Sequence, residues 1–153
     1  MIKCMHDATA LASIHAACFD RSWSEESFAE LLKGGGVHAL GDTDGFVVIR
    51  CVADEAEILT LCVLPAHRRA GLARKLVRAA IDLAATQYQV AHIFLEVGVD
   101  NHGARDLYAG LGFICHGRRR QYYASMDALM MRCDLTQGGP PASGDEKEGG
   151  AQP

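Results

Sequence analysis

The residues from Leu61 to Lys75 combine a basic cluster with the start of a helix, a combination that binds anions. Five of the nine residues from 67 to 75 are arginine, lysine or histidine. A helix N-terminus already carries about +0.5 of an elementary charge, and its first backbone N–H groups have no partner within the helix. Clustered cations are unfavourable there unless an anion lies among them, and Gly71 lets a ligand approach the backbone closely. We therefore predict a phosphate site, of the pyrophosphate kind; the alternative is a solvated basic first turn.

Glu96 is a carboxylate in an otherwise apolar segment. Residues 93–97 read Ile-Phe-Leu-Glu-Val, and apolar side chains on both alternating faces predict a strand that is buried on both sides. A carboxylate there is costly unless it is paired, and desolvation strengthens its hold on a proton, which suits a general base. The alternative is a glutamate near the strand end that reaches solvent or pairs with an arginine.

Asn101 and Tyr108 are seven residues apart in the next helical segment. At a rise of 1.5 Å per residue, this spacing places them on one helix face about 10 Å apart. Such a face could follow an extended ligand. The alternative for Tyr108 is an ordinary half-buried aromatic side chain.

The elements that must position these residues follow from hydrophobic spacing and from glycine-rich breaks. A capping box formed by Ser22 and Glu25 is predicted to start the second helix. Close spacing of the first three strands predicts antiparallel pairing, and helices that interrupt a mixed sheet predict a three-layer α/β (α+β) domain. We expect helices at 8–18, 24–33, 71–87 and 101–111, and strands at 37–40, 46–53, 57–63, 92–97, 113–120 and 129–135.

Length and composition limit the class of protein. A chain of 153 residues with 49% hydrophobic residues predicts one globular domain, over residues 1–135. Residues 136–153 hold five glycines and three of the four prolines, so we expect a disordered acidic tail. The sequence contains no long apolar run and no secretory signal, and its net charge is −4. We expect a cytoplasmic protein that binds neither membranes nor nucleic acid directly.

The six cysteines and seven histidines are scattered along the chain. No C-x-x-C or H-x-x-x-H spacing occurs, so we predict reduced, structural cysteines and no metal site.

Taken together, the pattern resembles the GCN5-related N-acetyltransferase (GNAT) superfamily. A strand is followed by Arg68-Arg69-Ala70-Gly71-Leu72-Ala73, which fits the superfamily's [RQ]-x-x-G-x-[GA] loop, and then by a long helix, Glu96, Asn101 and Tyr108, in the same order and spacing. The resemblance covers nearly all of residues 1–135. It implies a GNAT-type fold, with a mixed, mostly antiparallel central sheet and helices on both faces. It also implies an acetyl-CoA-dependent N-acetyltransferase, with acetyl-CoA as the acetyl donor. The resemblance further implies that the strand-edge backbone of Leu61, Cys62 and Val63 binds pantetheine, and that Asn101 binds the cofactor arm. The pyrophosphate would be held by the loop Arg69, Ala70, Gly71, Leu72, Ala73 and Arg74. Glu96 would be the general base and Tyr108 the general acid.

Within the superfamily, three segments are similar to the bacterial ribosomal-protein-alanine N-acetyltransferases: residues 21–28, 118–123 and 127–131. This resemblance implies that the acceptor is the N-terminal alanine of a small-subunit ribosomal protein, acetylated by direct attack of its amine. The alternatives are a lysine side chain or small-molecule amine as acceptor, or a non-catalytic acyl-CoA-binding module. The oligomeric state is not predicted.

Overall fold

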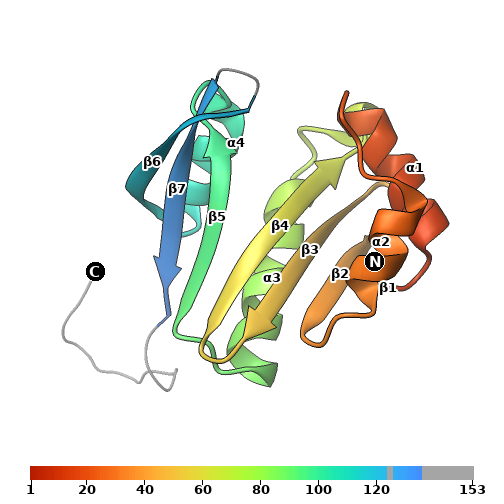
Figure 1. Ribbon diagram of the computed structural model, residues 1–153, viewed down its shortest axis with the longest axis horizontal. Coiled ribbons are helices and arrows are strands. Elements are labelled where there is room, and N and C mark those ends of the chain that lie inside the picture. The colour runs from red at the N-terminus through yellow and green to blue at the C-terminus, as the bar shows by residue number, and fades with distance from the viewer. Residues whose placement is uncertain (124–125, 136–153) are drawn as a thin grey trace.

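In the computed structural model, which describes residues 1–123 and 126–135, a seven-stranded sheet carries four α-helices on its two faces (Figure 1). The sheet order is β1-β2-β3-β4-β5-β7-β6. The tail predicted over residues 136–153 lies outside the described residues. In chain order the elements are β1 (Lys3–Met5), α1 (Ala8–Cys18), α2 (Glu25–Leu32), β2 (Val37–Asp42), β3 (Gly45–Val52), β4 (Glu55–Val63), the short 3-10 helix η1 (Pro65–His67), α3 (Leu72–Gln87), β5 (His92–Gly98), α4 (His102–Gly110), β6 (Ile114–Tyr123) and β7 (Met126–Asp134).

Strands β4 and β5 pair in parallel, whereas the other neighbouring strands of the sheet pair antiparallel. Helix α3 makes the crossover between these two strands, as a parallel pair requires. Their pairing covers only residues 55–57 of β4 and 92–94 of β5. Beyond this point the two strands diverge toward their C-terminal ends (Figure 1). The sheet therefore has an opening at its centre.

A β-bulge at Leu59 changes which face of the sheet the β4 side chains occupy. Val48 pairs with Thr60 and Ile49 with Ile58, so Leu59 is the extra residue. Before the bulge Ile58 packs with the α3 side of the core, whereas Leu59 packs with the α1 and α2 side. After it, Leu61 is again on the α3 side. The bulge thus lies beside the point where β4 leaves β5.

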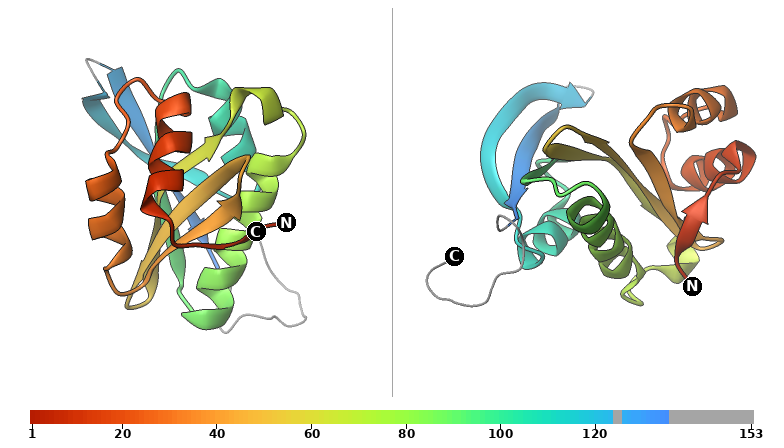
Figure 2. Two further views of the ribbon diagram at one scale, coloured as in Figure 1. Left: turned by 90° about the vertical axis from the view of Figure 1, so that its right-hand side faces the viewer. Right: turned by 90° about the horizontal axis from the view of Figure 1, so that it is seen from below.

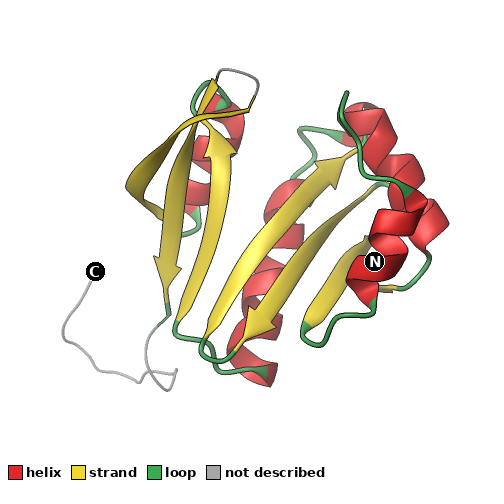
Figure 3. Ribbon diagram, viewed as in Figure 1, coloured by secondary structure: helices red, strands yellow, loops and turns green. Residues whose placement is uncertain are grey.

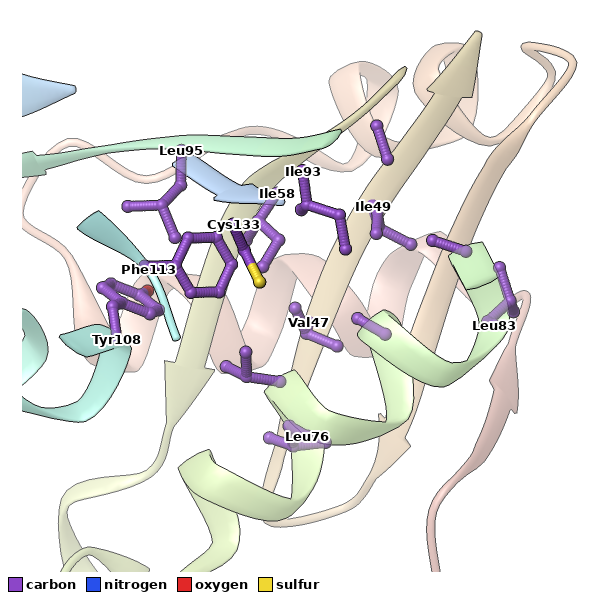
Figure 4. Close-up of a cluster of buried hydrophobic side chains, with 14 of the residues drawn as sticks. Val47, Ile49, Ile58, Leu76, Leu83, Ile93, Leu95, Tyr108, Phe113 and Cys133 are labelled. Atoms are coloured by element: carbon purple, nitrogen blue, oxygen red, sulfur yellow. The ribbon is translucent and has the colours of Figure 1, made fainter. Parts of the chain in front are cut away.

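The two faces of the sheet have separate cores. Helices α1 and α2 cover one face, and α3 and α4 cover the other (Figure 2). The α1 and α2 core includes the fully buried Phe28 and Phe46. The other core is larger and runs from Leu83 at one end to Tyr108 and Phe113 at the other (Figure 4). Each large apolar side chain buried in this way contributes about 1.5–3 kcal/mol.

The predicted fold class is confirmed, as are the type and order of the predicted helices and strands. The capping box is wrong: Ser24, not Ser22, caps α2, and its Oγ accepts a hydrogen bond from the Ser27 N–H at 3.0 Å. Two further elements, β1 and η1, are not predicted from the sequence.

The prediction that β5 is buried on both faces is wrong as well. Ile93, Leu95 and Val97 are buried, but the residues that alternate with them are only partly so. The physical reason is that α1 and α2 lie over β2 to β4 and leave this face of β5 open. No helix in the described part of the chain is long and apolar enough to cross a membrane.

Candidate active site

A cleft of about 480 Å³ occupies the opening between β4 and β5. The loops that follow β4 and β5 and the segment between α1 and α2 all lie at this end of the molecule, uppermost in Figure 3. The cleft brings together four residues that the sequence singles out: Leu61 of β4, and Glu96, Asn101 and Tyr108 from a later part of the chain.

Glu96 lies on β5, on the face that α1 and α2 leave partly open, and its side chain is 18% exposed. It forms an ion pair with Arg119 of β6. The Arg119 Nε and Nη2 both donate to Glu96 Oε2, at 2.9 and 2.7 Å. Both features that the sequence leaves as alternatives are therefore present. The carboxylate faces a cleft, and it pairs with an arginine.

Tyr108 lies on α4 and is 6% exposed. Its ring packs edge-on against Phe113, with ring centroids 5.7 Å apart (Figure 4). It also lines the cleft. Tyr108 is thus a core aromatic residue and a cleft residue at once.

Asn101 is the N-cap of α4 and not its first helical residue. Its Oδ1 accepts a hydrogen bond from the Ala104 N–H at 3.2 Å. The side-chain oxygen is therefore used within the protein, and the amide NH₂ is the group that a ligand in the cleft would meet.

Leu61 of β4 lines the cleft, whereas the side chains of Cys62 and Val63 are buried. Burial raises the pKa of the Cys62 thiol to about 12, so this group is an unreactive part of the core at neutral pH. The Val63 carbonyl accepts a hydrogen bond from Arg68 Nε at 2.8 Å. A ligand role for Cys62 and Val63 is accordingly limited to their backbone.

The basic loop before α3 contains two residues with left-handed backbone conformation. Arg69 has φ 68° and Gly71 has φ 84°. Gly71 is the N-cap of α3 and makes no side-chain capping bond. A Cβ at Gly71 would meet no protein atom within 4 Å. There is therefore open space beside the start of α3, where the first backbone N–H groups have no partner within the helix, as an anion site requires.

Residues 69–74 do not line the 480 Å³ cleft itself. Among them, Arg74 lies against α4: its Nη1 is 3.4 Å from where a Cβ on Gly110 would stand. Arg68, just before them, is held to β4 by its bond to Val63. The loop is thus tied to β4 at one end and reaches α4 at the other, so it frames the same opening.

The residues that line a second cleft beside Glu96 are not predicted as site residues from the sequence. A second cleft, of about 400 Å³, adjoins the first and shares Trp23, Ile58, Leu59 and Glu96 with it. Its other lining residues are Ser27, Leu31 and Glu57. The sequence signal for this second cleft is Trp23, the single tryptophan of the chain, which lies in the break between two predicted helices.

His15 of α1 is also missed, although it is a polar residue on the apolar face of a predicted helix. It is 2% exposed and stacks on Trp23, with ring centroids 4.8 Å apart. The Trp23 backbone N–H donates to His15 Nδ1 at 3.1 Å, and His15 Nε2 lies 3.3 Å from Thr60 Oγ1. Because Nδ1 accepts, the neutral ring carries its hydrogen on Nε2 and donates to Thr60. Burial lowers the pKa of His15, which favours this neutral form.

Comparison with known proteins gives a consistent result. The model of the Acetyltransferase (GNAT) family matches residues 8–113. A protein of Bacillus subtilis (strain 168), provisionally named a ribosomal protein bS18-alanine N-acetyltransferase, is 33% identical over 135 residues, which are 83% of this chain and 89% of that protein.

Solved structures show the same fold. The crystal structure of the ribosomal-protein-S18-alanine N-acetyltransferase from Escherichia coli superposes with a TM-score of 0.82 and 29% identity, over 94% of this chain and 98% of that one. A crystal structure of the NatC complex bound to Gag peptide and CoA gives a TM-score of 0.76 and 25% identity, over 89% and 98% of the two chains.

Proposed function

Because the chain belongs to the GNAT family and is an acetyl-CoA-dependent N-acetyltransferase, we propose that it acetylates a protein N-terminus, namely the N-terminal alanine of a small-subunit ribosomal protein. The similarity to the B. subtilis and E. coli enzymes supports this acceptor. In this proposal Glu96 is the general base, Tyr108 is the general acid, and the loop around Gly71 holds the donor.

The donor fits the residues present. The uncapped start of α3 offers backbone N–H groups to a pyrophosphate, and Arg69 and Arg74 add positive charge. Beyond Glu57, β4 has no strand partner on its β5 side among the described residues. Its edge can therefore pair with the amide groups of pantetheine. The bound donor supplies an acetyl thioester, and every proton transfer falls to side chains of this chain.

An N-terminal amine has a pKa of about 7.7–8.0 and is mostly protonated at neutral pH, so it must lose a proton before it can attack. Glu96, directly or through a water molecule, takes that proton. The amine nitrogen then forms a bond to the acetyl carbon, and the bond between that carbon and sulfur breaks. The Tyr108 hydroxyl gives its proton to the leaving thiolate. The second amine proton passes through the site and restores Tyr108, so one proton is released in total.

The observation that carries the proposal is that two adjoining clefts meet at Glu96. The first lies between β4 and β5, beside the donor loop. The second continues past Glu96 along α2 and β4, over Trp23 and Leu59. An acceptor that is only a small amine would leave this second cleft empty, whereas a peptide has residues to place there. An N-terminal amine also suits a carboxylate base better than a lysine amine does, because lysine has a pKa near 10.4.

The test is a panel of acceptors, incubated with the full chain and acetyl-CoA and followed by mass spectrometry. It holds a peptide with the N-terminal sequence of the ribosomal protein, the same peptide with its N-terminus blocked and an internal lysine, and small polyamines. We expect acetylation of the free N-terminal alanine alone. Transfer to the lysine or to the polyamines, with none to the N-terminus, would overturn the proposed acceptor.

A further inference from the structure

Arg119 reaches Glu96 across an intervening strand. β7 lies between β6 and β5, so the backbones that carry the two residues are about 10 Å apart, or two strand spacings. Arg119 of β6 pairs in register with Ala128 of β7, and Ala128 pairs with Gly98 of β5. Next to Arg119, this row of paired residues across the sheet therefore contains only the methyl group of Ala128 and Gly98, which has no side chain. A larger side chain in this row would block the path of the guanidinium.

The next row also keeps the path open. Glu96 pairs with Met130, and Met130 pairs with Gly117. A Cβ on Gly117 would lie 2.5 Å from the Met130 Cε, so the methionine side chain extends over the glycine and away from Glu96. Four small or displaced side chains therefore surround the contact between Arg119 and Glu96.

A β-bulge selects Arg119 from three consecutive arginines. The register of β6 advances by two residues, from Cys115 to Gly117, while β7 moves by one. His116 is the extra residue, and its ring meets Phe94 on the Glu96 side of the sheet. Because of this step, Arg119 shares a face with Glu96. Arg118 shares the other face with Asp127 and pairs with it at 2.7 Å.

We propose that Arg119 is a positioning residue for the Glu96 carboxylate, and the proposal rests on the general-base function proposed above. Both hydrogen bonds end on Oε2. Oε1 is then the oxygen to which no described residue donates, and it is the one offered to the acceptor amine. Two bonds from one planar guanidinium hold the Oε2 atom in place.

The experiment measures kcat and KM of the purified full chain, on whichever acceptor the panel identifies. We expect Arg119→Gln to lower kcat by about tenfold to a hundredfold, because a misplaced base is a poor one. The KM for acetyl-CoA should stay at the parent value, because Arg119 contacts the Glu96 carboxylate and not the donor loop. Arg119→Lys keeps a cation but not the planar fork, so it should recover part of the lost kcat.

Arg118→Gln is the matched control, since it removes a neighbouring arginine that is ion-paired on the opposite face. It should leave kcat unchanged. Acetyl-CoA affinity, measured by calorimetry, should be the same in all variants, which also shows that they fold. A parent-like kcat in Arg119→Gln, or a loss of kcat that Arg119→Lys does not recover even in part, would overturn the proposal.

Glu96→Gln separates this inference from the function on which it rests. If that variant keeps full turnover, Glu96 is not the base and the proposed chemistry fails. If it loses turnover by about 10²–10⁴-fold while Arg119→Gln behaves as the parent, the base stands and the inference about Arg119 alone fails.

Discussion

His15 holds three parts of the site together through one neutral ring. It connects α1 to the segment before α2 through Trp23 and to β4 through Thr60. Phe19 and Phe28 also pack against the ring. A charged imidazolium could not accept a hydrogen bond from the Trp23 N–H. The position of Trp23 in the wall of the second cleft therefore depends on His15 staying neutral.

We expect His15 to make stability depend on pH. Burial lowers its pKa below the ordinary value of 6.5, so as pH falls through about 6.5 the unfolded chain binds a proton that the folded chain does not. The free energy of unfolding should therefore fall from neutral pH toward the lowered pKa. His15→Gln should flatten this part of the curve, measured by urea unfolding at several pH values. Substitution of the exposed His6 is the control and should keep the slope, and parallel curves for the parent and His15→Gln would contradict the assignment.

At the scale of elements, local sequence predicts a helix more securely than its first residue. The apolar spacing of residues 8–18 gives the bounds of α1 as the structure has them. Ser22 and Ser24 are both good capping residues, and the local pattern favoured the wrong one. The choice depends on His15, which accepts the Trp23 N–H and so holds that residue outside the helix. A contact from another element thus decided where α2 begins.

Ser24→Ala should lower the free energy of unfolding by about 1 kcal/mol, because the Ser27 N–H loses its acceptor. Ser22→Ala is the matched control and should change it by less than about 0.5 kcal/mol. Denaturant unfolding of both variants makes the comparison. An equal loss in the two would mean that Ser24 is not the effective cap.

Gly71→Ala tests the start of α3. The left-handed φ of 84° should cost about 1 kcal/mol of stability in any residue with a Cβ. The new methyl group points into the space where the anion is expected, so the KM for acetyl-CoA should rise about tenfold or more. Gly35→Ala is the control, because its Cβ also meets nothing within 4 Å and its φ is not left-handed. It should leave KM unchanged; a similar rise in both variants would argue against a phosphate site at Gly71.

At the scale of the whole molecule, the two parts of the sheet are joined by a short ladder. Residues 55–57 and 92–94 form that junction, and the cleft occupies the rest of the boundary. The Leu59 bulge lies just beyond the last paired residue of β4, Glu57, where β4 and β5 separate. A donor bound at the β4 edge would form hydrogen bonds with the β4 backbone beyond Glu57, where β5 does not pair with it.

We expect acetyl-CoA to slow backbone hydrogen exchange over residues 58–61 of β4. A ligand at a hundredfold excess over its Kd stabilises the bound state by about 2.7 kcal/mol, and the effect should concentrate where the ligand binds. The ladder between β2 and β3 on the far side of the sheet is the internal control and should change little. Protection that appears there, with none over residues 58–61, would place the donor elsewhere.

The sequence by itself determined the type and order of the α-helices and of every strand except β1, and it predicted an anion site at Gly71 and a catalytic carboxylate and tyrosine in neighbouring elements. These features depend on hydrophobic period, helix-start chemistry and residue order, which are local properties. Tertiary structure decided that one face of β5 is open, that Ser24 caps α2, and that Arg119 and not Arg118 reaches Glu96. Each of these depends on register or on a contact between distant segments. A single-residue bulge inverts the face of every side chain after it, and local sequence does not show where that bulge lies.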